Sequence, residues 1–223
     1  MRWLFNLIRS LIGRRRELEN KLKTAHSELA QSFDTTVEAL GDALDLRGAA
    51  PPGHSRRVTA FTIAIAAKMG LRKDEIRVIA RGVFLHDIGK MAIPDGILHK
   101  QGELTPEETL LMHEHVFYGY KHLKKIPFLE DAAEIVYSQH ERYDGSGYPR
   151  GLKGEAIPLG ARIFAVADTF DSLTSDLPLA VETIDVARRE IALWSGRHFD
   201  PRIVEVFLTM PDTLWKNLSQ SSS

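Results

Sequence analysis

The stretch FLHDIGK, residues 84–90, places a histidine, an aspartate and a lysine at the end of a segment whose pattern is typical of a buried helix. The preceding apolar residues recur at the spacing of one helix face: Ile76, Ile79, Ala80 and Val83. Asp87 and Lys90 continue that face, and His86 lies beside them. Because a buried unpaired charge is costly, such residues neutralise, pair or bind a metal. The pattern therefore indicates a polar site at this end of the helix.

The chain has nine histidines and no cysteine, so any metal must be held by imidazole nitrogens or carboxylate oxygens. The candidate ligands are His54, His86, Asp87, His115, His140 and Asp168. They lie at the ends or on the apolar faces of five predicted helices, and no local His-x-x-x-His spacing links them. We interpret four other histidines as ordinary core or surface residues: His99, His113, His122 and His198.

The elements that must position these side chains are all predicted to be helices. Helical patterns cover residues 17–46, 54–69, 73–90, 129–140 and 159–175, and two more begin after Thr105 and after Asp200. Thr105, a proline and Glu108 form a capping-box pattern. We found no run of alternating polar and apolar residues, so the fold class is all-α. The tail at 213–223 is predicted to be disordered.

The N-terminal residues 1–28 are predicted to form an amphipathic, coiled-coil-like helix ahead of a domain at 29–212. Apolar residues from Leu18 to Leu44 alternate steps of three and four, which favours a homodimer or docking against the following domain. Residues 1–16 are too short and too interrupted for a transmembrane span, and their arginines follow the apolar part, unlike a signal peptide. The alternatives are peripheral contact with anionic lipid and packing on a partner.

Composition gives broad bounds. The 223 residues suit one domain with an extension, and 43% hydrophobic residues are enough for a core. A net charge of −1 gives no general attraction to DNA. The absence of cysteine fits a reducing compartment, so the expected location is the cytoplasm. The alternative is a cytoplasmic protein that also contacts the inner face of the membrane peripherally.

Five motifs together resemble the HD-GYP family, a branch of the HD metal-dependent phosphohydrolases. They are GHSRRV, HDIGK, MHEHVFYGY, HERYDGSGYP and ARIFAVADTFDSLTSD, in the family's order and approximate spacing over residues 30–210. The combination of HDIGK with DGSGYP is highly specific. The resemblance implies an HD-type helical bundle and a bacterial phosphodiesterase that opens the signalling molecule cyclic di-GMP.

The resemblance also implies roles for individual residues. The implied metal ligands are His54, His86, Asp87, His115, His140 and Asp168, with Asp87 bridging two divalent ions. Lys90 is implied as a catalytic cation that stabilises phosphoryl charge. Nitrogen and carboxylate ligands suit Fe or Mn, and also Ni, Co or Zn. A single-metal or purely structural site is the alternative.

The glycine-rich loop matches the family's signature for the rim of the active site. The implied substrate-binding residues are Asp144, Gly145, Gly147, Tyr148 and Pro149. Glycines let backbone amides approach a ligand, and Tyr148 offers a flat face and a hydroxyl group. The alternative is that half of the loop serves only to hold its own shape.

The sequence departs from the family's pattern in three respects. Gln139 stands where many members have a histidine, which predicts a weakly held second metal. Ala50 replaces the glutamate of three-metal members, so we expect two metals at most. Leu177 and Ala180 stand where basic residues commonly hold the substrate's phosphates, which predicts weak binding of cyclic di-GMP.

The leading hypothesis is a two-metal phosphodiesterase that converts cyclic di-GMP to pGpG and then to GMP. One alternative is a catalytically weak module that binds nucleotides or protein partners and signals through its N-terminal helix. The other is a phosphohydrolase that acts on a different cyclic nucleotide or phosphate ester. Intact ligands favour an enzyme, whereas the missing basic residues favour the alternatives.

Overall fold

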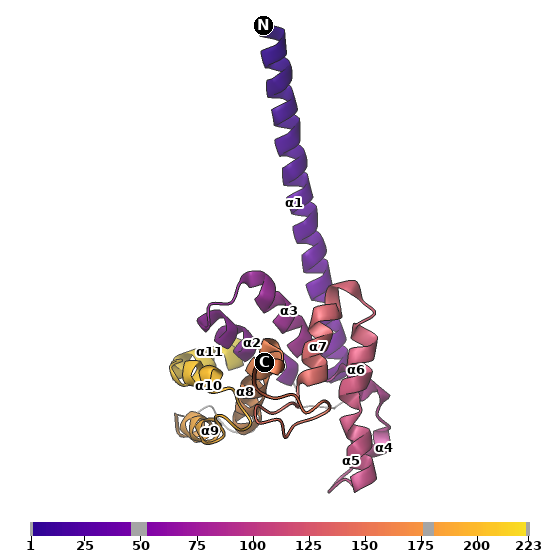
Figure 1. Ribbon diagram of the computed structural model, residues 1–223, viewed down its shortest axis with the longest axis vertical. Coiled ribbons are helices and arrows are strands. Elements are labelled where there is room, and N and C mark those ends of the chain that lie inside the picture. The colour runs from indigo at the N-terminus through magenta and orange to yellow at the C-terminus, as the bar shows by residue number, and fades with distance from the viewer. Residues whose placement is uncertain (1, 46–52, 176–180, 222–223) are drawn as a thin grey trace. The chain divides into compact units, whose positions relative to one another are not determined.

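The computed structural model describes residues 2–45, 53–175 and 181–221, and all regular elements within these ranges are helices (Figure 1). The α-helices are α1 (Arg2–Asp45), α2 (His54–Lys68), α3 (Lys73–Phe84), α4 (Asp95–Leu98), α5 (Pro106–His113), α6 (His115–Leu123), α7 (Glu130–Ser138), α8 (Leu159–Thr174), α9 (Val181–Leu193), α10 (Pro201–Leu208) and α11 (Asp212–Ser221). Three 3₁₀ helices join them: η1 (Ile88–Ala92), η2 (Pro127–Leu129) and η3 (Gly154–Ala156). The predicted all-α fold is confirmed.

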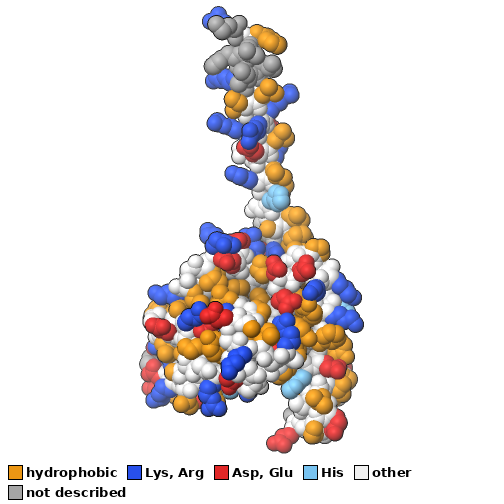
Figure 2. Space-filling view, viewed as in Figure 1, with side chains coloured by type: hydrophobic (Ala, Val, Ile, Leu, Met, Phe, Trp, Pro, Cys, Tyr) orange, Lys and Arg blue, Asp and Glu red, His pale blue; other side chains and the backbone are white. Residues whose placement is uncertain are grey.

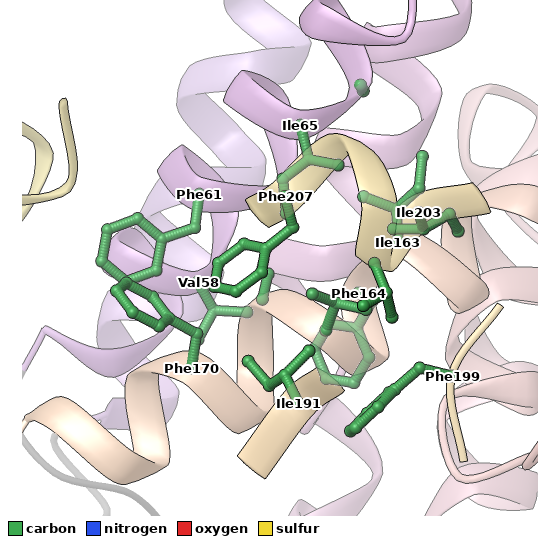
Figure 3. Packing of buried hydrophobic residues seen from close by; sticks show 14 of the residues in the cluster. Val58, Phe61, Ile65, Ile163, Phe164, Phe170, Ile191, Phe199, Ile203 and Phe207 are labelled. Carbon is green, nitrogen blue, oxygen red and sulfur yellow. The ribbon is translucent and has the colours of Figure 1, made fainter. Parts of the chain in front are cut away.

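Contacts divide the chain into two compact units, Met1–Ala39 and Leu40–Ser223. In the larger unit α2 packs against α3 and α8, and α7 packs against α3 and α6. Its core is aromatic, with Phe61, Phe164, Phe170 and Phe207 fully or almost fully buried (Figure 3). Rings of Phe61 and Phe170 meet edge to face at 5.2 Å, an arrangement that adds to the stabilisation from burial. This core is the support on which α2 and α8 hold their polar residues.

The segment that carries HDIGK is not the end of a long helix, and the prediction of a helix over 73–90 is wrong. α3 ends at Phe84, and η1 begins at Ile88 after a tight turn. The backbone tightens because η1 packs against the start of α6: a Cβ on Gly89 would lie 1.8 Å from the carbonyl oxygen of His115. Only glycine permits this approach. The turn brings Asp87 and Lys90 within ion-pair distance, at 2.7 Å.

The prediction of a disordered tail from residue 213 is also wrong, because α11 extends to Ser221. Trp215 anchors this helix and is completely buried. Its ring centroid lies 5.5 Å from Phe61, 5.1 Å from Phe170 and 5.3 Å from Phe207. Burying an indole removes a large apolar surface from water, and this contributes to the stability of α11 on the core.

The smaller unit is part of α1, which runs unbroken past the predicted boundary at residue 28. Leu11, Leu18, Leu22 and Leu29 are more than half exposed, and hydrophobic side chains recur along one side of α1 in Figure 2. Ion pairs one turn apart, such as Arg15 with Glu19 at 2.8 Å, support the helix locally. Within the described ranges, the helices are all too short or too polar to cross a bilayer.

Two of the sequence predictions concern positions outside the described residues. They are those on Ala50 and on the run from Leu177 to Ala180. Both stay predictions.

Candidate metal centre and cavity

Three histidines meet between α2, the α3–η1 turn and α6, and each has its Nδ1 atom fixed. The Nδ1 atoms of His54, His86 and His115 bond to the Asp171 carboxylate at 2.8 Å, the Val83 carbonyl at 2.8 Å and the Met112 carbonyl at 2.7 Å. Oxygens of this kind only accept, so each Nδ1 carries a proton and each Nε2 is the ring nitrogen left to face the cluster. Partners of this kind orient metal-binding histidines in proteins.

Asp87 lies at the centre of the cluster, and its side chain is almost completely buried. Its Oδ2 atom is 3.3 Å from Nε2 of His86, and its Oδ1 atom is 3.9 Å from Nε2 of His115. Burial alone would raise the pKa of Asp87, but His86 and Lys90 outweigh it and hold the pKa well below its usual value. The carboxylate is therefore ionised, and it presents one oxygen to each neighbouring histidine.

The remaining candidate ligands fall on the two sides of Asp87. His54, His86 and Asp168 have ligand atoms within 4.8 Å of one another. On the other side the rings of His115 and His140 lie edge to face at 5.3 Å. Burial lowers the pKa of His115, and burial together with His115 lowers that of His140 to about 3. Both imidazoles are thus neutral, which is the form that binds metals.

Gln139 brings a further oxygen to the second side. Its Nε2 donates to the carbonyl of His86 at 2.8 Å and lies 3.3 Å from Nε2 of His115, which fixes the amide. Its Oε1 atom is buried without a hydrogen-bond partner in the described part of the chain. An orphaned buried oxygen is costly. Together with the surrounding nitrogens and carboxylates, it fits a site for a cation.

Asp171 and Arg57 support His54 and were missed by the sequence analysis. Arg57 donates from Nε and Nη2 to the two oxygens of Asp171 at 2.7 and 3.0 Å, and Asp171 accepts from His54. Burial alone would raise the pKa of Asp171, but these partners lower it. The spacing could have revealed the residue, because Asp171 lies three positions after Asp168 and so shares its face of α8.

A cavity of about 440 Å³ is lined in part by the candidate ligands His140 and Asp168. From the predicted substrate-binding loop, Gly147 and Tyr148 line it together with Ser146. Asp144 instead accepts from the backbone and the hydroxyl of Ser146, and Gly145 adopts a φ of 87°, so both shape the turn. Neither these two nor Pro149 is among the lining residues in the described part of the chain.

Two histidines that we interpreted as ordinary residues also line this cavity, which corrects that interpretation. His113 stacks on Tyr148 with ring centroids 3.8 Å apart, and Tyr148 in turn stacks on His140 at 4.9 Å. His198 is another of the lining residues. His99 and His122 are exposed, as expected. The helix periodicity placed His113 away from His115, but it could not show that the 141–158 loop folds back over it.

Comparison with known proteins gives the family. The profile described as "HD domain" matches residues 38–203. The chain is 41% identical over 194 residues to the cyclic di-GMP phosphodiesterase response regulator RpfG of Xanthomonas campestris pv. campestris, covering 86% of this chain and 51% of that protein. It is 38% identical over 184 residues to 3'3'-cGAMP-specific phosphodiesterase 2 of Vibrio cholerae, covering 81% and 35%.

Among solved structures, a cyclic GMP-AMP-specific phosphodiesterase of V. cholerae superposes with a TM-score of 0.66 at 25% identity, covering 84% of this chain and 51% of that chain. The chain therefore belongs to the HD domain family, within its HD-GYP branch. HD domains bind divalent metals, in agreement with the donor set described above. The chain spans about half or less of the length of these relatives.

Proposed function

We propose that the chain is a metal-dependent phosphodiesterase that hydrolyses a cyclic dinucleotide, with cyclic di-GMP as its substrate and pGpG, then GMP, as products. The observation that carries the proposal is the position of Asp87, with an oxygen toward a histidine on each side. The names of the relatives support the reaction class, since those proteins are phosphodiesterases for cyclic di-GMP or cyclic GMP-AMP.

Two divalent ions fit the donors, one on each side of Asp87. His54, His86 and Asp168 would hold the first, His115 and His140 with the Gln139 oxygen would hold the second, and Asp87 would bridge them. Fe or Mn suits these nitrogen and oxygen donors best, with Ni, Co or Zn as alternatives. When bound, such a pair supplies a nucleophile at neutral pH and polarises the phosphate under attack.

The chain's own residues prepare the site for this reaction. The fixed Nδ1 bonds hold the imidazoles in the orientation that ligation requires, so little reorganisation is needed. Lys90, whose Nζ lies 2.7 Å from Oδ2 of Asp87, places a cation beside the bridging carboxylate. From this position it would stabilise the charge that develops on the phosphoryl oxygens. Gly147 and Tyr148 on the cavity wall would position the rest of the substrate.

The test combines metal content with hydrolysis. We expect the chain loaded with Mn, or with Fe without oxygen, to hold two ions and to cleave cyclic di-GMP, as followed by chromatography. Asp87→Ala should lose both ions and all hydrolysis, because it removes the bridge, while its helical circular dichroism persists. The control is Asp74→Ala, an exposed acid paired with Arg72, which should keep both properties.

Wild-type activity and metal content in Asp87→Ala would disprove the two-metal site. Metal without hydrolysis of any ester in the unmodified chain would favour the non-catalytic module. Hydrolysis of 3'3'-cGAMP in place of cyclic di-GMP would change the substrate and keep the reaction class.

We also propose that the chain forms a homodimer through α1 and works in the cytoplasm. The exposed leucines of α1 support this partner, because water-exposed leucine rows pair in coiled coils. The alternative is that residues 1–16 contact the inner face of the membrane peripherally. Sedimentation with anionic vesicles tests it.

A further inference from the structure

The cavity beside the metal ligands is larger than a single reacting phosphate requires. Its volume of about 440 Å³ lies in the range of sites that hold whole small molecules. The proposed metal ligands His140 and Asp168 line it, and so do Arg142, Ser146 and His198. A substrate that fills the cavity from the metals would therefore meet Arg142.

Arg142 is the only lining residue with a permanent positive charge in the described part of the chain. Its side chain is exposed, and within the described ranges no hydrogen bond or ion pair joins it to another side chain. The neighbouring acid does not neutralise it, since Glu141 accepts from the backbone amides of Arg150 at 2.8 Å and Leu152 at 2.9 Å. The guanidinium is thus available to an anion.

The backbone beneath Arg142 is held on both sides, so the base of this cavity-lining side chain is fixed. Its carbonyl accepts from the amide of Gly145 at 2.8 Å, and the next residue, Tyr143, donates to the carbonyl of His198 at 3.2 Å. A Cβ on Gly147 would lie 2.3 Å from the amide nitrogen of Arg142, so the loop packs closely against this residue. A cation on a rigid support loses little entropy on binding a ligand.

The cavity also has a flat aromatic surface. His113, Tyr148 and His140 form a stack in which successive rings lie 3.8 and 4.9 Å apart. An aromatic surface and a guanidinium in one cavity match a nucleotide, which joins a planar base to an anionic phosphate. Arginine suits the phosphate because its planar fork makes two parallel hydrogen bonds.

We infer that Arg142 anchors the phosphate of the cyclic dinucleotide that does not lie at the metals. The inference rests on the proposed function and adds a residue that determines which substrates bind. Arg142 holds a part of the substrate that does not react, so it contributes to binding in the ground state and in the transition state alike. It also supplies a cation that does not depend on positions 177 and 180.

The experiment measures binding of cyclic di-GMP to metal-free protein by calorimetry, at low and at high salt. Arg142→Gln should weaken binding by roughly ten- to hundredfold, the range for losing hydrogen bonds to a charged group. Arg142→Lys should be intermediate, because it keeps the charge and loses the fork. The difference between Arg142→Gln and wild type should shrink at high salt, where charges are screened.

The matched control is Arg197→Gln. Arg197 is exposed and close in sequence to His198, but its guanidinium lies over the ring of Trp194, 4.9 Å from its centroid, and it does not line the cavity. This variant should change binding by less than about twofold. In metal-loaded protein Arg142→Gln should raise KM for cyclic di-GMP by a larger factor than it raises KM for bis(p-nitrophenyl) phosphate, which has one phosphate.

Three results would overturn the inference: wild-type affinity in Arg142→Gln, no binding of cyclic di-GMP by the unmodified protein, or equal losses on both esters. Failure of the proposed function looks different, since loaded wild-type protein would then hydrolyse neither ester. The binding measurements without metal would still decide the role of Arg142.

Discussion

At the scale of single residues, the candidate centre is organised by what each polar atom already bonds. Nδ1 atoms of three histidines are engaged by fixed oxygens, and the Asp87 carboxylate is kept ionised by His86 and Lys90. The Nε2 atoms of these histidines are left to face the centre. This arrangement cannot be predicted from residue types alone. Two of the three Nδ1 atoms donate to backbone carbonyls, and every residue has a backbone carbonyl.

Substitutions of Gln139 test how tightly the proposed second metal is bound, on the side of Asp87 that carries His115 and His140. Gln139→His should tighten the weaker of two binding steps for Mn, because a nitrogen ligand replaces an amide oxygen beside His140. Isothermal titration of the metal-free protein measures the step. As the control, Gln139→Leu keeps a similar volume without the oxygen and should weaken the same step. An unchanged isotherm in both variants would place Gln139 outside the coordination shell.

Asp171 tests whether the orientation of His54 matters for metal binding. Asp171→Ala should weaken the first metal step by roughly ten- to hundredfold, since His54 loses the acceptor that fixes its Nδ1 proton. Asp171→Glu, which keeps the acceptor, should restore part of the affinity. Metal titration followed by circular dichroism separates this effect from unfolding. Wild-type affinity in a folded Asp171→Ala protein would contradict the positioning role.

At the scale of elements, the sequence predicted helix boundaries correctly where the residues that decide them lie within one helical turn. The capping box was predicted and is present, because Thr105 accepts from the amide of Glu108 and Glu108 accepts from that of Thr105, at 3.3 and 2.7 Å. The end of α3 was missed because it is decided by packing of Gly89 against α6, far along the chain. Periodicity carries no information about such a contact, and so it continued the helix to Lys90.

The N-terminus of α10 gives a prediction on pH. Asp200 accepts from the amide of Arg202 at 2.9 Å and pairs with the buried Arg162. Burial alone would raise the pKa of Asp200, but Arg202 and Arg162 lower it. A lowered pKa in the folded state stabilises the protein above the unfolded value near pH 4. That contribution is lost as pH falls through the folded pKa.

Asp200→Asn should therefore destabilise the protein by about 3 kcal/mol at neutral pH, because it leaves Arg162 buried without its charge partner. The difference from wild type should narrow as pH falls below about 4. Urea unfolding across this pH range measures both effects. Asp74→Asn serves as the exposed control, and a constant difference at every pH would show that Asp200 does not titrate as described.

At the scale of the whole molecule, the sequence was sufficient for fold class and family but not for the cavity. The candidate ligands come from α2, the α3–η1 turn, α6, the end of α7 and α8, and only the assembled core brings these elements together. The resemblance supplied that assembly for the ligands. It did not supply His113, Arg142 or His198, whose meeting depends on how the 141–158 loop lies on its neighbours. Trp215 was missed because the polar composition around it hid one large apolar residue.

The last prediction concerns the self-association of α1. Leu18 and Leu22 are 66% and 60% exposed, and burying a leucine stabilises an association by about 1.5–3 kcal/mol. Leu18→Glu with Leu22→Glu should convert a dimer to a monomer in sedimentation equilibrium, since charges would face each other at the seam. Asn20→Glu with Thr24→Glu adds the same charge on the opposite face of the helix and should leave the dimer intact. Hydrolysis of a simple ester should persist in the monomer if the larger unit holds the whole site. A wild-type chain that is monomeric at all concentrations, or equal dissociation of both double variants, would contradict pairing through these leucines.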